Sequence, residues 1–288
     1  MKKRTTVLAL ALIAIIAISL AGCGQAKKTE VKSGLSANEI ISRSNKKMEA
    51  VKSYRAQGTY KMSAPAISST PSQGNEKMEF SFEMKMKMNT PTDFEGQMVT
   101  KGLGTETTVY MKNGYAYANV PGKGWVKAPV TDFSKSQTAT PEQISEYTKW
   151  AKDMKVSSED SKGWNIDFEI RPEFFQEQLK KALGTSVPTG ESSAPSNGYA
   201  QIIQELAKST TMNMSLRILK NTFYLENARM LMSMKNVPQL GDMEMDISIS
   251  LSDFNSPVTV TIPAEAQSAK EVTPEEIPGL SGETFPGL

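Results

Sequence analysis

A strict alternation of apolar and polar residues is the main pattern in this chain. In MEFSFEMKMKM, residues 78–88, every even position is apolar and every odd position is polar. A period of two predicts a strand with one buried face. Burial of that face outweighs the preference for Val and Ile in strands. The same alternation predicts strands at 54–63, 93–102, 105–112, 115–117, 125–126, 163–170, 210–220, 223–236, 242–254 and 257–263.

Helices are predicted from their end signals. Ser36 and Glu39 form a capping box, in which each residue accepts from a free backbone N–H of the other. Thr140, Pro141 and Gln143 open a second helix that we expect to run to about Met154. Two more helices are predicted at 172–184, from Pro172 to Gly184, and at 199–209.

These elements predict an α+β fold. About nine or ten antiparallel strands with one apolar face each need a second layer to cover that face. We therefore expect a single curved antiparallel sheet, a half-open β-barrel, with helices packed in or over its concave face across residues 36–268. Two domains that divide near residue 135 are the alternative.

The first residues predict export and lipidation. Lys2, Lys3 and Arg4 precede an apolar run of 14 residues, and Leu20-Ala21-Gly22-Cys23 follows. Residues 1–22 are therefore read as a signal peptide, and Cys23 as the lipidated residue of a lipobox. A single transmembrane anchor is the alternative, although spanning a bilayer needs about 20 apolar residues. The expected location is the extracytoplasmic face of the cell membrane.

Polar segments flank the predicted domain. Residues 23–35 are expected to form a flexible tether that reaches about 40 Å when extended. Residues 269–288 are rich in Pro and Gly and are expected to form a disordered tail.

Composition excludes several kinds of chemistry. The chain has no histidine, and Cys23 is its only cysteine, so it lacks the residues for a Cys/His zinc site or a Ser-His-Asp mechanism. Without the first 22 residues, which hold three basic and no acidic side chains, the chain carries 30 basic and 31 acidic residues, a net charge of −1. It has no basic stripe interleaved with aromatics, so we expect no nucleic-acid partner.

Methionine is concentrated in the predicted strands, which hold 14 of the 17. Methionine is flexible and polarizable, and it suits surfaces that must adapt to varied apolar ligands. It also fills ordinary cores, so a solid interior remains the alternative. The outward rows of Lys, Glu, Ser and Thr are expected to face solvent.

The chain resembles bacterial envelope lipoproteins of the LolA/LolB and LppX/LprG type. The resemblance rests on the lipobox, the helix after Ser36, the segment VYMKNGYAYANVPGKGWVK (109–127) and the ending FNSPVTVTIPAEA (254–266). It implies a half-barrel around a hydrophobic cavity that receives lipids or acyl chains. The residues implied to line the cavity are Phe80, Phe82, Met84, Met86, Met88, Met214, Leu216, Met230, Met232 and Met234.

Three functions follow as hypotheses. The first is a non-enzymatic, membrane-anchored lipoprotein that binds a lipid or another apolar ligand and needs no cofactor or metal. The second is a solid-cored structural or regulatory lipoprotein that binds an envelope protein or the cell wall. The third is an enzyme that uses paired carboxylates, with Glu142, Glu146, Asp153 and Glu169 as candidates.

Overall fold

A computed structural model of the chain describes residues 34–65, 75–88, 90, 93–130, 141–184, 207–237 and 241–277. They belong to one compact unit, Ser33–Leu288. Cys23 and the signal peptide lie outside these residues, so their assignment remains a prediction. No helix in the described ranges has the length and apolar character needed to cross a membrane.

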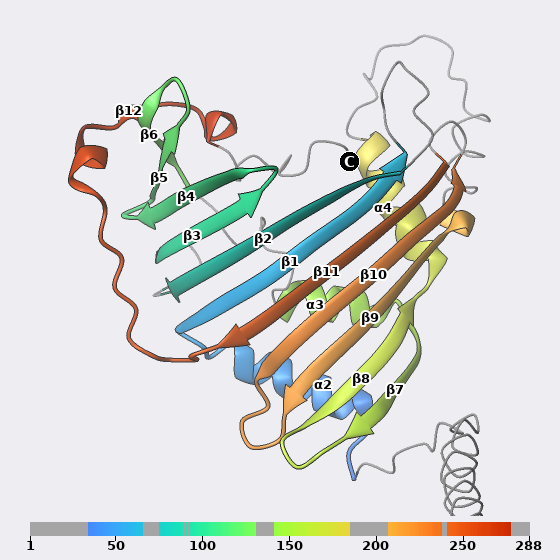
Figure 1. Ribbon diagram of the computed structural model, residues 1–288. Helices are drawn as coiled ribbons and strands as arrows, with labels where there is room; N and C mark the ends of the chain where they lie inside the picture. The colour runs from blue at the N-terminus through green and yellow to red at the C-terminus, as the bar shows by residue number, and fades with distance from the viewer. Residues whose placement is uncertain are drawn as a thin grey trace, which may run out of the picture. The chain divides into compact units, whose positions relative to one another are not determined.

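Twelve strands form one sheet in the described part of the chain (Figure 1). Its order is β12-β6-β5-β4-β3-β2-β1-β11-β10-β9-β8-β7. The strands are β1 Ser53–Pro65, β2 Asn75–Met88, β3 Phe94–Gly102, β4 Thr105–Lys112, β5 Tyr115–Val120, β6 Gly124–Pro129, β7 Ala151–Glu159, β8 Gly163–Ile170, β9 Thr210–Leu219, β10 Leu225–Val237, β11 Gly241–Ser252 and β12 Lys270–Glu271.

The sheet is antiparallel except where β12 pairs with β6. Strand β1 pairs with β2 on one side and with β11 on the other. This seam joins strands from both sides of residue 135 into one sheet, which argues against two separate domains there. The predicted fold class, a curved and open antiparallel sheet with few helices, is confirmed.

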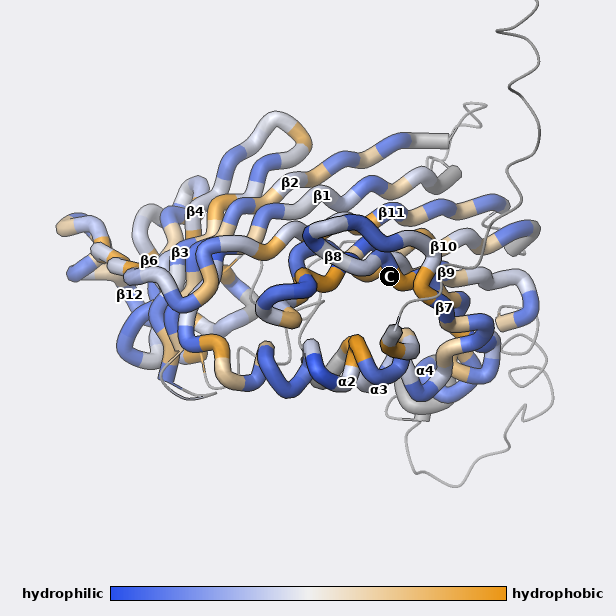
Figure 2. The backbone as a smooth tube through the Cα atoms, turned by 90° about the horizontal axis from the view of Figure 1, so that it is seen from below, coloured by the Kyte–Doolittle hydropathy of each residue, from blue (hydrophilic) through white to orange (hydrophobic). Residues whose placement is uncertain are grey.

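Three helices lie on one side of the sheet, within its concavity (Figure 2). They are α2 Ala37–Met48, α3 Pro141–Lys149 and α4 Pro172–Gly184. The predicted capping box of α2 is present, because Ser36 Oγ accepts from Glu39 N–H at 3.3 Å and Glu39 Oε2 accepts from Ser36 N–H at 2.9 Å. Its buried residues, Ala37, Ile40, Ile41 and Ser44, are spaced three or four apart and form one stripe on the helix.

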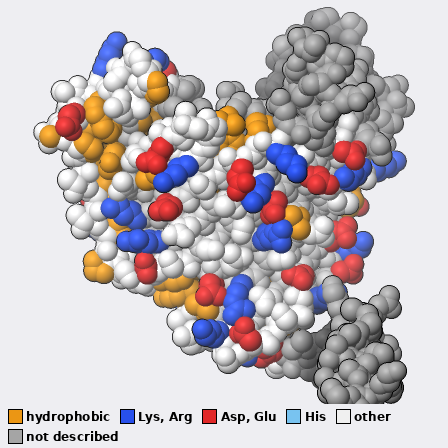
Figure 3. Space-filling model, in the orientation of Figure 1, with side chains coloured by type: hydrophobic (Ala, Val, Ile, Leu, Met, Phe, Trp, Pro, Cys, Tyr) orange, Lys and Arg blue, Asp and Glu red, His pale blue; other side chains and the backbone are white. Residues whose placement is uncertain are grey.

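The convex face carries the predicted polar rows (Figure 3). Arg229 binds Asp246 through two hydrogen bonds of 2.8 and 3.0 Å. Arg217 donates to Glu226 at 2.7 Å and to Asp160 at 2.9 Å. Exposed pairs of this kind add little stability, and they keep this face hydrated.

The predicted helix from Thr140 to Met154 is wrong in its second half. α3 ends at Lys149, and Ala151–Glu159 forms the edge strand β7. Arg171 caps the end of α3 by donating to the carbonyls of Lys149 at 2.7 Å and Trp150 at 3.3 Å. Pairing with β8 then outweighs local helix propensity, and a register shift accompanies the positive φ of Asp153.

The predicted strand at 257–263 is also absent. Pro257 and Pro263 remove backbone donors that a strand needs, and the segment runs irregularly after β11. It is held instead by Lys112 Nζ, which donates to the Val260 carbonyl at 2.9 Å. Val260 is buried.

Part of the expected disordered tail is ordered. Beyond the 3₁₀ helix η2 (Ala264–Ser268), strand β12 pairs with β6, and the 3₁₀ helix η3 (Pro274–Glu276) follows. Lys123 Nζ donates to Glu276 at 2.7 Å, and Ile277 is fully buried. The expectation fails here because β6 offers an open edge for pairing; residues 278–288 lie outside the described ranges. Of the predicted helix at 199–209, only 207–209 are described, and they are helical.

Two hairpin turns differ in how well their sequence suits their backbone. Asn113 and Gly114 have φ values of 55° and 76°, as their Asn-Gly sequence predicts. Leu103 and Gly104 have nearly the same values, 49° and 75°, although leucine disfavours this region. Leu103 is 68% exposed, so packing does not compensate for its conformation.

Leu103→Asn is therefore expected to raise the free energy of unfolding by about 1 kcal/mol, because asparagine tolerates a positive φ. The reciprocal change Asn113→Leu serves as the control and should lower it by a similar amount. Denaturant unfolding of both variants measures the difference. A less stable Leu103→Asn protein would show that Leu103 makes a stabilising contact.

Candidate functional site: the concave face

Strand register places all ten predicted cavity residues on one face of the sheet. Directly paired residues project to the same side, and the pairs form rows across the strands. One row contains Phe82, Gly58, Ile249, Ala228 and Leu216; the next contains Phe80, Tyr60, Ile247, Met230 and Met214. Met84, Met86, Met88, Met232 and Met234 follow the same alternation.

Burial divides these ten residues into two groups. Met86, Met214 and Leu216 are buried in the core. The other seven are half-buried: Phe80, Phe82, Met84, Met88, Met230, Met232 and Met234. The second group lies on β2 and β10, toward the middle of the sheet. Its half-exposed apolar atoms are what a ligand would contact, although the role of these residues as a ligand site remains a prediction.

The same face contains residues that the predicted cavity omitted. Met78, Met98 and Met243 are half-buried and face inward, while Tyr60, Met62 and Met245 are buried. Each follows the alternation of its strand, so the period alone could have identified them. Burial raises the pKa of the Tyr60 hydroxyl to about 12. The Tyr60 ring packs edge-to-face against the Phe80 ring, and the two ring centres lie 6.4 Å apart.

Glycines shape this face by making room for large side chains. A Cβ at Gly58 would lie 2.3 Å from the Phe82 ring and 2.9 Å from the Ser248 carbonyl oxygen. A Cβ at Gly102 would lie 2.2 Å from the Phe80 ring. Both aromatic rings therefore lie flat across a neighbouring strand, a way in which sheets cover exposed glycines.

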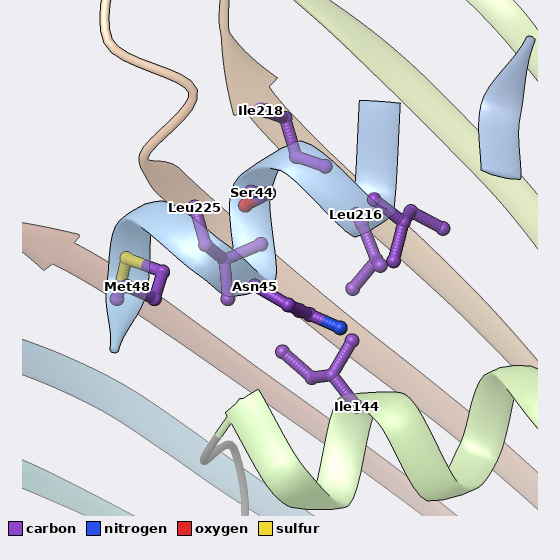
Figure 4. A pocket seen from close by; sticks show the side chains of 8 residues that line it. Ser44, Asn45, Met48, Ile144, Leu216, Ile218 and Leu225 are labelled. Atoms are coloured by element: carbon purple, nitrogen blue, oxygen red, sulfur yellow. The ribbon is translucent and has the colours of Figure 1, made fainter. Parts of the chain in front are cut away.

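Helix α2 closes one end of the face with little space beneath it. The void between α2, α3 and strands β9 and β10 has a volume of about 10 Å³, at the lower limit for one water molecule. Figure 4 shows Ser44, Asn45 and Met48 of α2 next to Leu216, Ile218 and Leu225, with Ile144 of α3 below them in this view. A drug-sized ligand needs roughly 300 Å³ or more, so α2 must move before one can bind there.

In the described part of the chain, one cation–π contact links the middle of α2 to the sheet, and hydrogen bonds hold the segment that follows the helix. The Arg43 guanidinium lies 5.6 Å from the centre of the Phe223 ring, in the turn between β9 and β10. Beyond the helix, Lys52 N–H donates to Asn255 Oδ1 at 2.8 Å, and Ser53 Oγ donates to the Ser256 carbonyl at 2.6 Å. Two hydrogen bonds thus hold the segment that joins the C-terminal end of α2 to β1. The middle of α2 contacts the β9–β10 turn through one cation–π pair.

A hollow of about 330 Å³ opens on the convex face. Polar residues of four strands make up most of its lining, together with Gly58, Phe82 and Val99: Gln57, Thr59, Ser81, Glu83, Lys101, Ser248 and Ser250. It is hollow because serine and threonine stand between longer charged side chains. Its open, hydroxyl-rich surface contrasts with the apolar concave face.

Two of the four candidate catalytic carboxylates lie beside lysine side chains. Glu146 pairs with Lys149 at 2.8 Å, and Glu169 lies 4.0 Å from Lys152. Asp153 is exposed, and the side chain of Glu142 lies outside the described residues. Within the described ranges, no group of three or more His, Cys, Asp or Glu side chains could hold a metal ion.

The fold and this face define a class of protein, a half-open antiparallel sheet with an apolar concave side. The chain belongs to the family described as "Family of unknown function (DUF6612)", which it matches over residues 36–271. No curated protein matches the sequence.

Three solved structures are similar in fold. LprF from Mycobacterium bovis is 15% identical with a TM-score of 0.43, covering 79% of this chain and 97% of its own. MucB in complex with MucA(peri) is 10% identical with a TM-score of 0.32, covering 80% and 60%. A LolA superfamily protein from Nitrosomonas europaea is 9% identical with a TM-score of 0.24, covering 78% and 95%. These similarities are similarities of fold alone.

Gly58→Ala tests the close approach of Phe82 to β1. The added methyl group overlaps the ring and the Ser248 carbonyl, so we expect a loss of about 1–3 kcal/mol in unfolding free energy. Phe82→Leu in the same chain should recover part of that loss because the smaller side chain vacates the space. Denaturant unfolding of both single variants and the double variant gives the coupling; additive effects would contradict the contact.

Tyr60 should make stability fall at alkaline pH. Its pKa is raised in the folded state to about 12 from an unfolded value near 10, so its contribution is complete below about pH 10 and is lost as pH rises toward 12. Tyr60→Phe should remove this part of the alkaline loss. Unfolding free energies at pH 8, 10 and 11 test it, and an unchanged slope would contradict the assignment.

Proposed function

We propose that this protein is a non-enzymatic, membrane-anchored lipoprotein that binds a lipid or another apolar, flexible ligand on the concave face of its sheet. One observation carries the proposal: inward-facing Met and Phe residues form a continuous surface over neighbouring strands, and its central part is only half-buried. Soluble domains rarely leave such surface open without a use for it. Methionine suits that use because it repacks around varied shapes.

Binding would gain its free energy by removing acyl chains from water, at about 0.8 kcal/mol per buried methylene. The ligand would contact the half-buried residues of β2 and β10. Since the void under α2 holds no more than a water molecule, further burial requires α2 to lift from β9 and β10. Lifting α2 exposes Ile40 and Ile41, which are buried, so the acyl chains that the ligand buries must offset the cost of exposing these side chains.

Lipidation at Cys23 would place this domain at the extracytoplasmic face of the membrane. A multiply acylated cysteine holds stably in a bilayer, whereas one acyl chain holds only marginally. A domain anchored in this way would present or sense its ligand locally.

The filled space beneath α2 favours a second candidate, a solid-cored lipoprotein that binds an envelope protein or the cell wall. For this role the hydroxyl-lined hollow on the convex face is the place of contact. Cross-linking in cells that recovers one dominant partner through this face, from a protein that never carries lipid, would establish it.

Native mass spectrometry of the full chain carrying Cys23→Ser tests lipid binding. We expect co-purified ligand, its loss after extraction with organic solvent, and uptake of added phospholipid or fatty acid. A protein that stays free of ligand throughout would contradict the proposal.

A pair of neighbouring residues on β10 supplies a matched control. Met230 faces inward and is half-buried, whereas Leu231 faces outward and is 39% exposed. Met230→Gln keeps length and shape but adds a polar amide to the concave face, so occupancy should fall several-fold. Leu231→Gln should leave it unchanged. Equal effects of the two variants on ligand occupancy would contradict ligand binding on the concave face.

A further inference from the structure

Four methionines form a rectangular block on two adjacent strands. Met232 of β10 pairs with Met245 of β11, and Met234 pairs with Met243. All four face the concave side, and register extends the block sideways. Met245 also pairs with Met62, Met62 with Met78, and Met232 with Met212. One row thus holds five methionines on the consecutive strands β2, β1, β11, β10 and β9.

The dimensions of the block let four sulfur atoms converge. Paired Cβ atoms in an antiparallel sheet lie roughly 5 Å apart, and diagonal neighbours roughly 7–8 Å. Each Cβ therefore lies roughly 4 Å from the centre of the rectangle. The thioether sulfur sits two flexible bonds beyond Cβ, so all four can turn toward one point above the sheet.

The block is accessible and chemically uniform. Met232, Met234 and Met243 are half-buried, and only Met245 is buried, at 6% exposure. Ordinary core packing does not require methionine here, because Val and Ile fit a half-buried strand better. Among the described residues no cluster of His, Cys, Asp or Glu competes for a metal ion, and the whole chain has no histidine.

We propose that Met232, Met234, Met243 and Met245 form a binding site for a soft monovalent metal ion, Cu(I), with Ag(I) as its redox-inert substitute. Uncharged thioethers are soft ligands that select Cu(I), while Zn(II) and Cu(II) prefer imidazole, thiolate or carboxylate. A thioether carries no proton at any ordinary pH. Binding here therefore needs no deprotonation, unlike binding by cysteine, histidine or carboxylate.

Competition with bicinchoninate tests the site, using the full chain with Cys23→Ser under anaerobic conditions. Cys23→Ser removes the one thiol that would bind Cu(I) independently. We expect one Cu(I) per chain, with an affinity that stays constant between about pH 5 and 8. An affinity that falls with acidification would assign the metal to titrating ligands and overturn the proposal.

The diagonal double variant Met232→Leu/Met243→Leu should weaken Cu(I) binding at least about tenfold, since it removes half of the ligands. Met→Leu changes volume little and preserves folding. Met84→Leu/Met98→Leu is the matched control, because these two half-buried methionines are also directly paired on the concave face, on β2 and β3. They offer two thioethers instead of four, and their loss should leave binding unchanged.

Methionine-methyl NMR is an independent test, because it leaves the four methionines in place and does not depend on the folding of a Met→Leu variant. On addition of one equivalent of Ag(I) to the chain with Cys23→Ser, we expect the four methyl resonances of Met232, Met234, Met243 and Met245 to shift, with Met84 and Met98 unmoved. Shifts spread evenly over all methionines, or none, would refute the site. Because Met230 lies outside the block, the lipid-binding experiment can fail or succeed separately.

Discussion

One constraint shapes this protein: a single sheet must keep one face apolar over most of its width, and only three described helices lie against it. The seam between β1 and β11 makes that face continuous, because it joins a meander from the first half of the chain to strands from the second half. Helix α2 fills the space over Leu216 and Ile218 of β9 and Leu225 at the start of β10 almost completely. Over β2, β3 and the rest of β10 the same face is left half-buried, and this is where Met and Phe gather.

Methionine and glycine solve the packing of such a face together. Gly58 and Gly102 let Phe82 and Phe80 lie flat across the neighbouring strands. Methionine then fills the irregular gaps between aromatic rings without fixing one arrangement. A surface of this kind can adapt to an apolar ligand. The two methionine pairs on β10 and β11 are the thioethers of the metal site that we propose.

Much of this could be predicted from sequence because the period of two is unambiguous. It identified the inward faces of β2, β9 and β10, and the Ser36–Glu39 box set the start of α2. The failures lie where tertiary contacts override local signals. Arg171 ends α3 at Lys149, and β8 recruits the next residues as β7. The edge of β6 orders a segment whose composition suggests disorder. No local pattern could show that Met232 and Met245 are partners, since register between distant strands sets that pairing.

The central claim is that the concave face receives a flexible apolar ligand. Methionine-methyl NMR with a spin-labelled fatty acid tests it, because the sixteen methionines within the described ranges report from defined places. We expect strong broadening at the half-buried inward residues Met84, Met98 and Met230, and little at Met154 on the edge strand β7. Broadening confined to Met154, or none at all, would contradict it.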